Sequence, residues 1–276
     1  MKNIFLLLSI TVIWSCKTLQ SGNPPISSLV FDAIEAENIH QVTLSYRLKI
    51  ENPNRLLLNS QINNYNVIIN GKKKEPEFAV LQYEKLLPIK NGVSNVTEIS
   101  LHLILKGENI NEDFYKIILV LDILHQYSAE LQFNEELSVI SDFPNIREPL
   151  FTITSIVIMQ ADLINTRFAA NLRIENPNPF PMTLDNFEYK LYGDGLLWAQ
   201  GKEKDILKIQ SKGSEEAKLI LTMNFINMKR NLLDQIIAMR KVNYRFAGTA
   251  EALVDIFWLP IFKLDFDNTG YSDVVR

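Results

Sequence analysis

The chain repeats part of itself at an offset of 124 residues. Leu48–Asn54 reads Leu-Lys-Ile-Glu-Asn-Pro-Asn, and Leu172–Asn178 reads Leu-Arg-Ile-Glu-Asn-Pro-Asn. Two further matches keep the same offset: Tyr65 with Tyr189, and Asn70-Gly71 with Asp194-Gly195. Because an offset of this size is close to the length of one domain, the sequence predicts one folded module built twice.

Apolar and polar residues alternate before each Asn-Pro-Asn motif and again later in each copy. Alternation with a period of two is typical of strands that bury one face. The predicted buried faces comprise Val42, Leu44, Tyr46, Leu48, Ile50, Ile99, Leu101, Leu103 and Leu105 in the first copy, and Phe168, Ala170, Leu172, Ile174, Ala217, Leu219, Leu221, Met223 and Phe225 in the second. Pro53 and Pro177 lack a backbone donor, so each motif is expected to end a strand or to bulge it at an edge.

Each copy also contains one segment whose apolar residues have helical spacing. These residues are Phe114, Ile117, Ile118, Leu121 and Leu124 in the first copy, and Leu232, Leu233, Ile236 and Ile237 in the second. Asn111 and Asn227 stand where N-caps are expected. The predicted fold is therefore all-β, with two tandem antiparallel β-sandwiches that each carry one α-helix.

The N-terminus has the features of a lipoprotein leader. A short cationic start is followed by an apolar run, Ile4–Trp14, which is too short to span a bilayer. Ile13-Trp14-Ser15-Cys16 resembles a bacterial lipobox, although Trp14 stands where a small residue is usual, and Cys16 is the only cysteine of the chain. The pattern predicts cleavage before Cys16 and acylation of that residue, with an ordinary secretory leader as the alternative.

These observations divide the chain into four parts. Residues 1–15 are the expected signal peptide, and residues 16–26 form a tether containing Ser, Gly, Asn and two prolines. Residues 27–148 and 149–276 are the two expected sandwiches, joined by a short segment with two prolines. Lys17 follows the cysteine in place of the Asp that retains some lipoproteins at the inner membrane, which favours an outer-membrane location in a bacterial envelope.

The second copy resembles a known family. Its pattern is Asn-Pro-Asn-Pro-Phe-Pro, then Tyr189 before a glycine turn, then Trp-Ala-Gln-Gly, then Ile209 and Gly213 before an alternating strand. This is similar to the water-stress and hypersensitive-response domain of the group 2 late embryogenesis abundant proteins. The matching positions, which the resemblance implies to be structural, are Asn52, Pro53, Asn54, Asn176, Pro177, Asn178, Pro179, Phe180 and Gly201. The first copy diverges, since Arg55-Leu56 replaces the Pro-Phe pair.

The resemblance implies a fibronectin- or immunoglobulin-like sandwich and a non-enzymatic role linked to desiccation and other stress. It also offers an alternative role as a lipid carrier, because related domains in membrane proteins have been suggested to hold lipid in an apolar groove. Phe257, Trp258 and Phe262 belong to the densest aromatic stretch after the leader, and they are the best candidates for a ligand surface. Buried strand is the more ordinary interpretation of such a run.

Catalytic and metal chemistry find no support in the sequence. His40, His102 and His125 are scattered and are expected at surfaces or edges, no Gly-x-Ser-x-Gly elbow occurs, and the only thiol belongs to the predicted anchor. Asp265–Gly270 begins like a calcium loop but ends without its glutamate, so a solvated tail is expected there. A net charge of -4 gives no reason to expect nucleic acid. We therefore expect no cofactor, and partners limited to the membrane through the N-terminal lipid, to lipids or to envelope proteins.

Overall fold

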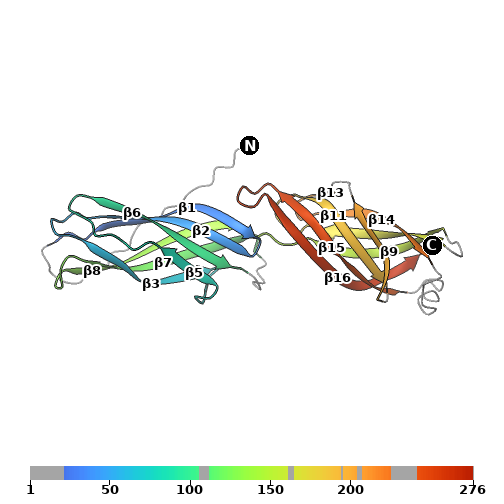
Figure 1. Cartoon of the computed structure of the whole chain (residues 1–276), viewed down its shortest axis with the longest axis horizontal. Coiled ribbons are helices and arrows are strands. Elements are labelled where there is room, and N and C mark those ends of the chain that lie inside the picture. Colours follow the sequence, from blue (N-terminus) through green and yellow to red (C-terminus); the bar gives the residue numbers. More distant parts are fainter. Residues whose placement is uncertain are drawn as a thin grey trace. The chain divides into compact units, whose positions relative to one another are not determined.

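The computed structural model describes residues 22–105, 112–160, 165–193, 195–203, 207–224 and 241–275 (Figure 1). The chain divides into two compact units, Met1–Asn145 and Ile146–Arg276. The residues described in both units are all-β, and no helix occurs among them. In particular, they contain no helix long and apolar enough to cross a membrane.

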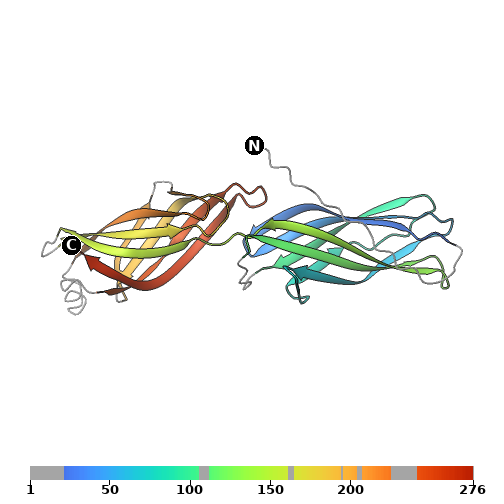
Figure 2. The same cartoon turned by 180° about the vertical axis from the view of Figure 1, so that it is seen from behind.

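Two four-stranded sheets build the first unit (Figures 1 and 2). One sheet has the order β1-β2-β6-β5, and its strands are β1 (Ile26–Asn38), β2 (Gln41–Glu51), β6 (Ser94–Ile104) and β5 (Ala79–Tyr83). The other has the order β4-β3-β7-β8, and its strands are β4 (Lys72–Lys73), β3 (Asn59–Ile69), β7 (Phe114–Gln126) and β8 (Gln132–Pro144). All pairings within these sheets are antiparallel.

The core of the first unit lies between the two sheets. The hydroxyl groups of Tyr46 on β2 and Ser141 on β8 are 3.0 Å apart and buried, so side chains of different sheets meet there. Burial raises the pKa of Tyr46 far above its usual range, and the hydrogen bond to Ser141 acts in the opposite direction. The predicted strand faces are confirmed, because Val42, Leu44, Tyr46, Leu48 and Ile50 are all buried, as are Ile99, Leu101, Leu103 and Leu105.

The second unit has one hydrogen-bonded sheet of eight strands, ordered β12-β11-β15-β16-β9-β10-β14, with β13 paired to β11. Its strands are β9 (Leu150–Gln160), β10 (Asn165–Glu175), β11 (Met182–Gly193), β12 (Leu196–Glu203), β13 (Leu207–Ile209), β14 (Ser214–Asn224), β15 (Val242–Val254) and β16 (Ile261–Val275). The pairing of β16 with β9 over Asp273–Val275 is parallel, and the other pairings are antiparallel.

Aromatic rings fill the interior of this second unit. The rings of Phe151 on β9 and Phe187 on β11 both stack on that of Phe266 on β16, with ring centroids 4.4 Å and 5.3 Å apart. The ring of Phe246 on β15 lies 5.2 Å from that of Phe266 and completes the cluster. The cluster joins four strands of the sheet, and all four rings are buried in the core of the unit.

The predicted helix of the first copy is wrong. Phe114–Leu124 lies in β7, where Ile117, Leu119, Leu121 and Ile123 are buried at alternate positions. The other face of β7 is also apolar and half-buried at Ile118 and Val120, so the sequence lacks the alternation that identifies a strand. The second predicted helix at Leu232–Ile237 and both predicted caps, Asn111 and Asn227, lie outside the described residues.

Two smaller expectations have different outcomes. The expected solvated tail is wrong, because Asp265–Gly270 lies within β16, paired along β15. The tight turn at Asn70-Gly71 is confirmed, since both residues have positive φ, at 47° and 80°. Positive φ at both central positions is the requirement of the hairpin turn that Asn-Gly favours.

Candidate functional site

Each Asn-Pro-Asn motif directly follows a strand: β2 ends at Glu51 and β10 ends at Glu175. The first asparagine of each motif is buried, and Pro53 and Pro177 are half-buried. The motif therefore ends the ladder where a residue without a backbone donor is tolerated. The side-chain amides then replace the lost backbone pairing.

The side chain of Asn52 joins three segments of the first unit. Its Oδ1 accepts a hydrogen bond from the backbone N–H of Asn54 at 2.9 Å, which closes a tight local turn. Its Nδ2 donates to the carbonyl oxygens of Leu56 and Ile89, both at 2.8 Å. One buried amide thus holds the chain after the motif against the loop that precedes β6.

Asn176 does the same in the second unit. Its Oδ1 accepts from the backbone N–H of Asn178 at 3.0 Å and from Asn178 Nδ2 at 2.9 Å. Its Nδ2 donates to the carbonyl oxygens of Phe180 at 2.8 Å and Gln210 at 3.1 Å. The first asparagine therefore has the same three kinds of partner in both units.

The second asparagine of each motif clamps the segment that leads into its unit. Asn54 Nδ2 donates to the Asn23 carbonyl at 2.5 Å, and Asn54 Oδ1 accepts from the Asn23 N–H at 3.0 Å. Asn178 pairs in the same two ways with the backbone of Arg147, both at 2.7 Å. We call the four asparagines Asn52, Asn54, Asn176 and Asn178 the paired clamps.

The clamped residues keep the offset of the sequence repeat. Asn23 and Arg147 are 124 residues apart, and each stands three residues before its strand, β1 at Ile26 or β9 at Leu150. Sequence reasoning identified the motifs but missed both clamped residues, because neither residue type nor spacing marks a backbone partner. The clamps consist of amides and carbonyls, which position chain segments and supply neither a nucleophile nor a titratable group.

Gly201, the last family-motif position, lies in β12 opposite Tyr189 on β11. A Cβ added at Gly201 would stand 2.7 Å from Tyr189 Oη. The tyrosine ring therefore covers the glycine, which explains why this position accommodates no larger residue without movement of the ring.

The candidate ligand residues do not form one surface. Phe257 and Trp258 lie in the loop between β15 and β16, which is closed by hydrogen bonds from Val254 N to Pro260 O at 2.9 Å and from Leu259 N to Ile256 O at 3.2 Å. Phe257 is 77% exposed, Trp258 is half-buried, and Phe262 is buried in the core on β16. Of these three residues, Phe257 alone is largely exposed to a partner. The predicted lipidation residue, Cys16, lies outside the described residues.

The expectation of a surface or edge position is wrong for His125, which is fully buried on β7. Its Nδ1 lies 2.9 Å from the Ser60 hydroxyl on β3, and its Nε2 lies 2.9 Å from a Glu135 carboxylate oxygen on β8. These are the residue types of a hydrolytic triad, but the imidazole has no exposed surface on which a substrate could stand. We interpret the group as a buried polar link across three strands.

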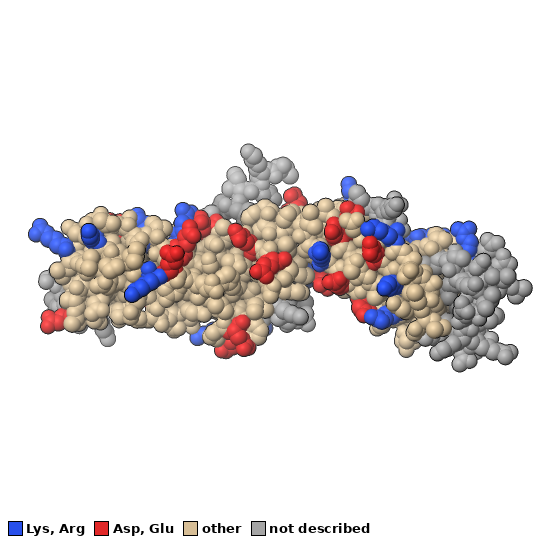
Figure 3. Space-filling model, viewed as in Figure 1, with Lys and Arg blue, Asp and Glu red and all other residues tan. Residues whose placement is uncertain are grey.

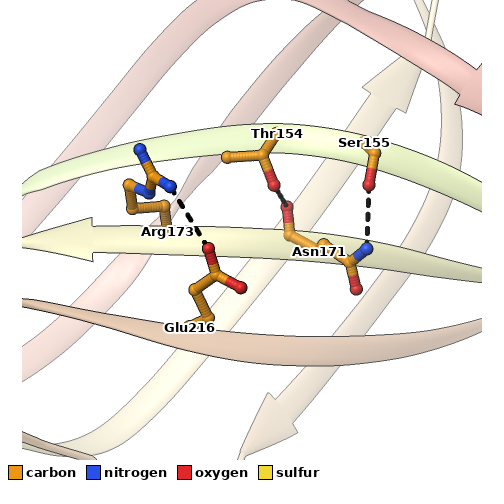
Figure 4. Close-up of polar contacts among 5 residues, drawn as sticks. All are labelled: Thr154, Ser155, Asn171, Arg173 and Glu216. Carbon is orange, nitrogen blue, oxygen red and sulfur yellow. Dashed lines mark hydrogen bonds and ion pairs between the residues drawn. The ribbon is translucent and has the colours of Figure 1, made fainter.

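The outer face of β9, β10 and β14 carries a ladder of polar contacts (Figure 4). Thr154 is the extra residue of a bulge in β9, and its hydroxyl donates to the Asn171 carbonyl at 3.1 Å. Asn171 Nδ2 donates to the Ser155 hydroxyl at 2.8 Å. The exposed pair Arg173–Glu216, with 3.3 Å between nitrogen and oxygen, contributes at most about 1 kcal/mol. These contacts fasten neighbouring strands and do not converge on a common point (Figure 4).

The charged side chains that the structure describes give no sign of a metal site, and those on the face in Figure 3 give none of a nucleic-acid site. No group of three or more potential metal ligands occurs in the part of the chain that the structure describes. Acidic and basic side chains are interspersed on the face seen in Figure 3, without a continuous basic stripe. Such mixed charge is typical of an ordinary solvated surface.

Comparisons with known proteins find a match to one family model in part of the second unit. Residues 171–269 match the model of the late embryogenesis abundant protein family, LEA_2, and this range includes the second Asn-Pro-Asn motif and Gly201. The corresponding prediction is confirmed for that range. A search of curated proteins gives no match.

Several solved structures resemble the chain at low identity. A protein of Archaeoglobus fulgidus is 14% identical, with 46% of this chain and 96% of that one covered and a TM-score of 0.27. A protein of Arabidopsis thaliana is 13% identical, with 48% and 86% covered and a TM-score of 0.36. A Bacteroides uniformis β-glucuronidase is 12% identical, with 85% and 28% covered and a TM-score of 0.27. These scores are too low to carry an argument about function.

Proposed function

We propose that the chain is a bacterial envelope lipoprotein, acylated at Cys16, whose two units are copies of one late-embryogenesis-type module. In this proposal each unit is a fibronectin- or immunoglobulin-like sandwich. The protein has a non-enzymatic role in protecting or binding envelope components under water stress. The observation that carries the role is the family match over residues 171–269.

The paired clamps support the duplication. The two units share more than a sequence motif, since each first asparagine joins the same three kinds of backbone partner. Each second asparagine holds the backbone of a residue three positions before the first long strand of its unit. Retention of a non-local contact at the same offset favours two copies of one module over a chance repeat of seven residues.

The polar clusters among the described residues support a binding or protective role. In the described residues, the polar clusters at the clamps and at His125 have their hydrogen bonds directed to one another or to backbone groups. Polar groups satisfied in this way stabilise a fold and leave no group aimed at a substrate.

Intact mass of the protein extracted from host membranes tests the anchor. The expected wild-type mass begins at Cys16 and includes a diacylglycerol and an acyl chain, and Cys16→Ala loses both the lipid and membrane retention. A wild-type chain with an unmodified Cys16 contradicts the anchor.

A separate assay tests the protective role. A labile enzyme is dried and rehydrated with the purified chain or with an equal mass of serum albumin, and recovered activity is compared. Better recovery with the chain supports protection. Equal recovery, together with co-purified lipid in organic extracts of the chain, favours the lipid-carrier alternative.

A further inference from the structure

One end of the first unit presents apolar side chains to solvent. We call it the tether end, because Asn23, the residue clamped by Asn54, reaches the unit there. Two loops, residues 55–57, which follow the clamp, and residues 84–93, which precede β6, form its apolar part, and a third loop, residues 127–131, lies beside Gly22 at the same end. The large exposed apolar residues of these loops are Leu56, Leu57, Leu87 and Val93.

Asn52 and a backbone bridge hold the two loops side by side. The amide of Asn52 binds the carbonyls of Leu56 in the first loop and Ile89 in the second. Leu58 and Ile89 also exchange backbone hydrogen bonds, at 3.0 Å and 2.8 Å. Leu58 and Ile89 are themselves buried, so each loop is rooted in the core while Leu56 and Leu87, 52% and 64% exposed, point outward. The exposed leucines are therefore held in place before any partner binds.

Basic side chains stand among these apolar residues. Arg55, Lys85 and Lys90 are exposed in the two apolar loops, which contain one acidic residue, Glu84, and Glu130 is exposed in the third loop. Apolar residues flanked by Lys and Arg match the boundary between acyl chains and anionic headgroups.

The length of the tether places this end within reach of a lipid on Cys16. Gly22, the first described residue, is six residues after Cys16, and a chain extends by at most about 3.5 Å per residue, or about 20 Å in total. β1 has 13 residues and runs away from the tether end for about 40 Å. An anchored unit would therefore present its tether end to the bilayer, while the other end could not reach it in that orientation.

The equivalent loops of the second unit lack this character. The segment after its motif is Pro179-Phe180-Pro181, in which Phe180 is half-buried. The segment before β14 contains Gln210, Ser211 and Lys212. The clamp therefore does not itself require exposed leucines. Of the two units, the one that follows the tether has them in these loops.

We propose that the tether end of the first unit docks into the membrane surface, with Leu56, Leu57 and Leu87 inserted at the acyl-chain boundary and Arg55, Lys85 and Lys90 facing anionic headgroups. This inference rests on the proposed anchor at Cys16. It adds a second, non-covalent contact that orients the first unit on the bilayer.

Site-specific labelling tests the docking. Cys16 is the only native cysteine and is blocked when acylated, so Leu87→Cys carries a single environment-sensitive fluorophore. The acylated chain is placed in vesicles of phosphatidylglycerol and phosphatidylcholine. The label at position 87 is expected to shift to the blue and to be quenched by lipids brominated on their acyl chains. Leu197→Cys, at a leucine of the second unit that is 51% exposed, is the control and keeps the emission of a label in water.

A partition measurement tests the same surface without the lipid anchor. The soluble Cys16→Ser chain, lacking the leader, is mixed with the same vesicles. The triple variant Leu56→Gln, Leu57→Gln, Leu87→Gln is expected to bind the vesicles about tenfold more weakly than the unsubstituted soluble chain. The control, Leu197→Gln, Ile220→Gln, Val275→Gln, removes three exposed apolar residues of the second unit and keeps wild-type binding.

The outcomes separate failure of the anchor from failure of the docking. If mass shows no acylation, the chain with Cys16→Ser, which leaves position 87 or 197 as the single thiol, is attached through an N-terminal hexahistidine segment to a nickel-chelating lipid, and the labels are read as before. Equal emission from positions 87 and 197 on the vesicles overturns the docking, whether or not Cys16 is acylated. A dimer of the soluble chain that the first triple variant dissociates also overturns it, because a second copy would then cover the leucines.

Discussion

The clearest quantitative expectation concerns Asn176. Substitution Asn176→Ala removes four side-chain hydrogen bonds: two that Asn176 accepts from the N–H and the side-chain amide of Asn178, and two that it donates to the carbonyls of Phe180 and Gln210. At about 1 kcal/mol per hydrogen bond the loss is about 4 kcal/mol, and it rises if the buried backbone groups stay unpaired. For a unit of this size that free energy lowers the melting temperature by roughly 15 °C.

Calorimetry measures this loss unit by unit. Asn176→Ala is expected to move the unfolding transition of the second unit, and Asn52→Ala that of the first, because each amide serves its own unit. Asn176→Asp keeps the acceptor oxygen but turns a carboxylate oxygen toward two carbonyls, so it is expected to be at least as harmful as alanine.

Asn171→Ala is the matched control, because its side chain makes one hydrogen bond, to Ser155, on the outer face of the sheet. We expect it to cost about 1 kcal/mol or less. An Asn176→Ala variant no less stable than Asn171→Ala would refute the view that the clamps hold the units together.

Other contacts give smaller or sharper tests. Gly248→Ala is expected to destabilise the second unit by about 2 kcal/mol or more in urea unfolding, because its Cβ would stand 2.0 Å from a backbone carbonyl oxygen of β11. Tyr46→Phe should cost about 1–3 kcal/mol by orphaning the Ser141 hydroxyl, and adding Ser141→Ala should recover much of that loss in the same measurement. The hydrogen bond and charge of Arg245 lower the pKa of Asp267, so NMR titration should find that pKa below its usual range and Arg245→Ala should raise it. Because the folded-state pKa is lowered, the stabilising contribution of Asp267 is present above its unfolded-state pKa and is lost as pH falls through the folded one.

Alternation of apolar and polar residues predicted the strands well where one face of the strand is exposed to solvent. β2 has polar outward positions such as Lys49 and Arg47, so its period of two stands out in the sequence. β7 does not show this alternation because both of its faces carry apolar residues. A continuous apolar run fits a helix as well as a strand. The composition of β7 held the better clue, since Ile and Val have branched side chains that favour strands.

The candidate site was predictable only in its residue types. The Asn-Pro-Asn motifs stand out because they recur, but their partners Asn23 and Arg147 lie 31 residues away and contribute backbone groups, which any residue has. His125 was misplaced for a related reason. Its burial depends on Ser60 and Glu135, which reach it from two other strands.

The clamp at Asn23 has a mechanical consequence. The chain reaches the first unit at the end where Ile26 pairs with Glu51, and it leaves at the opposite end, where Pro144 pairs with Phe114. Tension between those two points therefore pulls along the strands, and the hydrogen bonds of β1 with β2 would have to shear together instead of opening one after another. A unit connected in this way can transmit force along the chain while its fold stays intact. Force applied from the N-terminal side acts on the Asn23–Asn54 hydrogen bonds before it reaches β1.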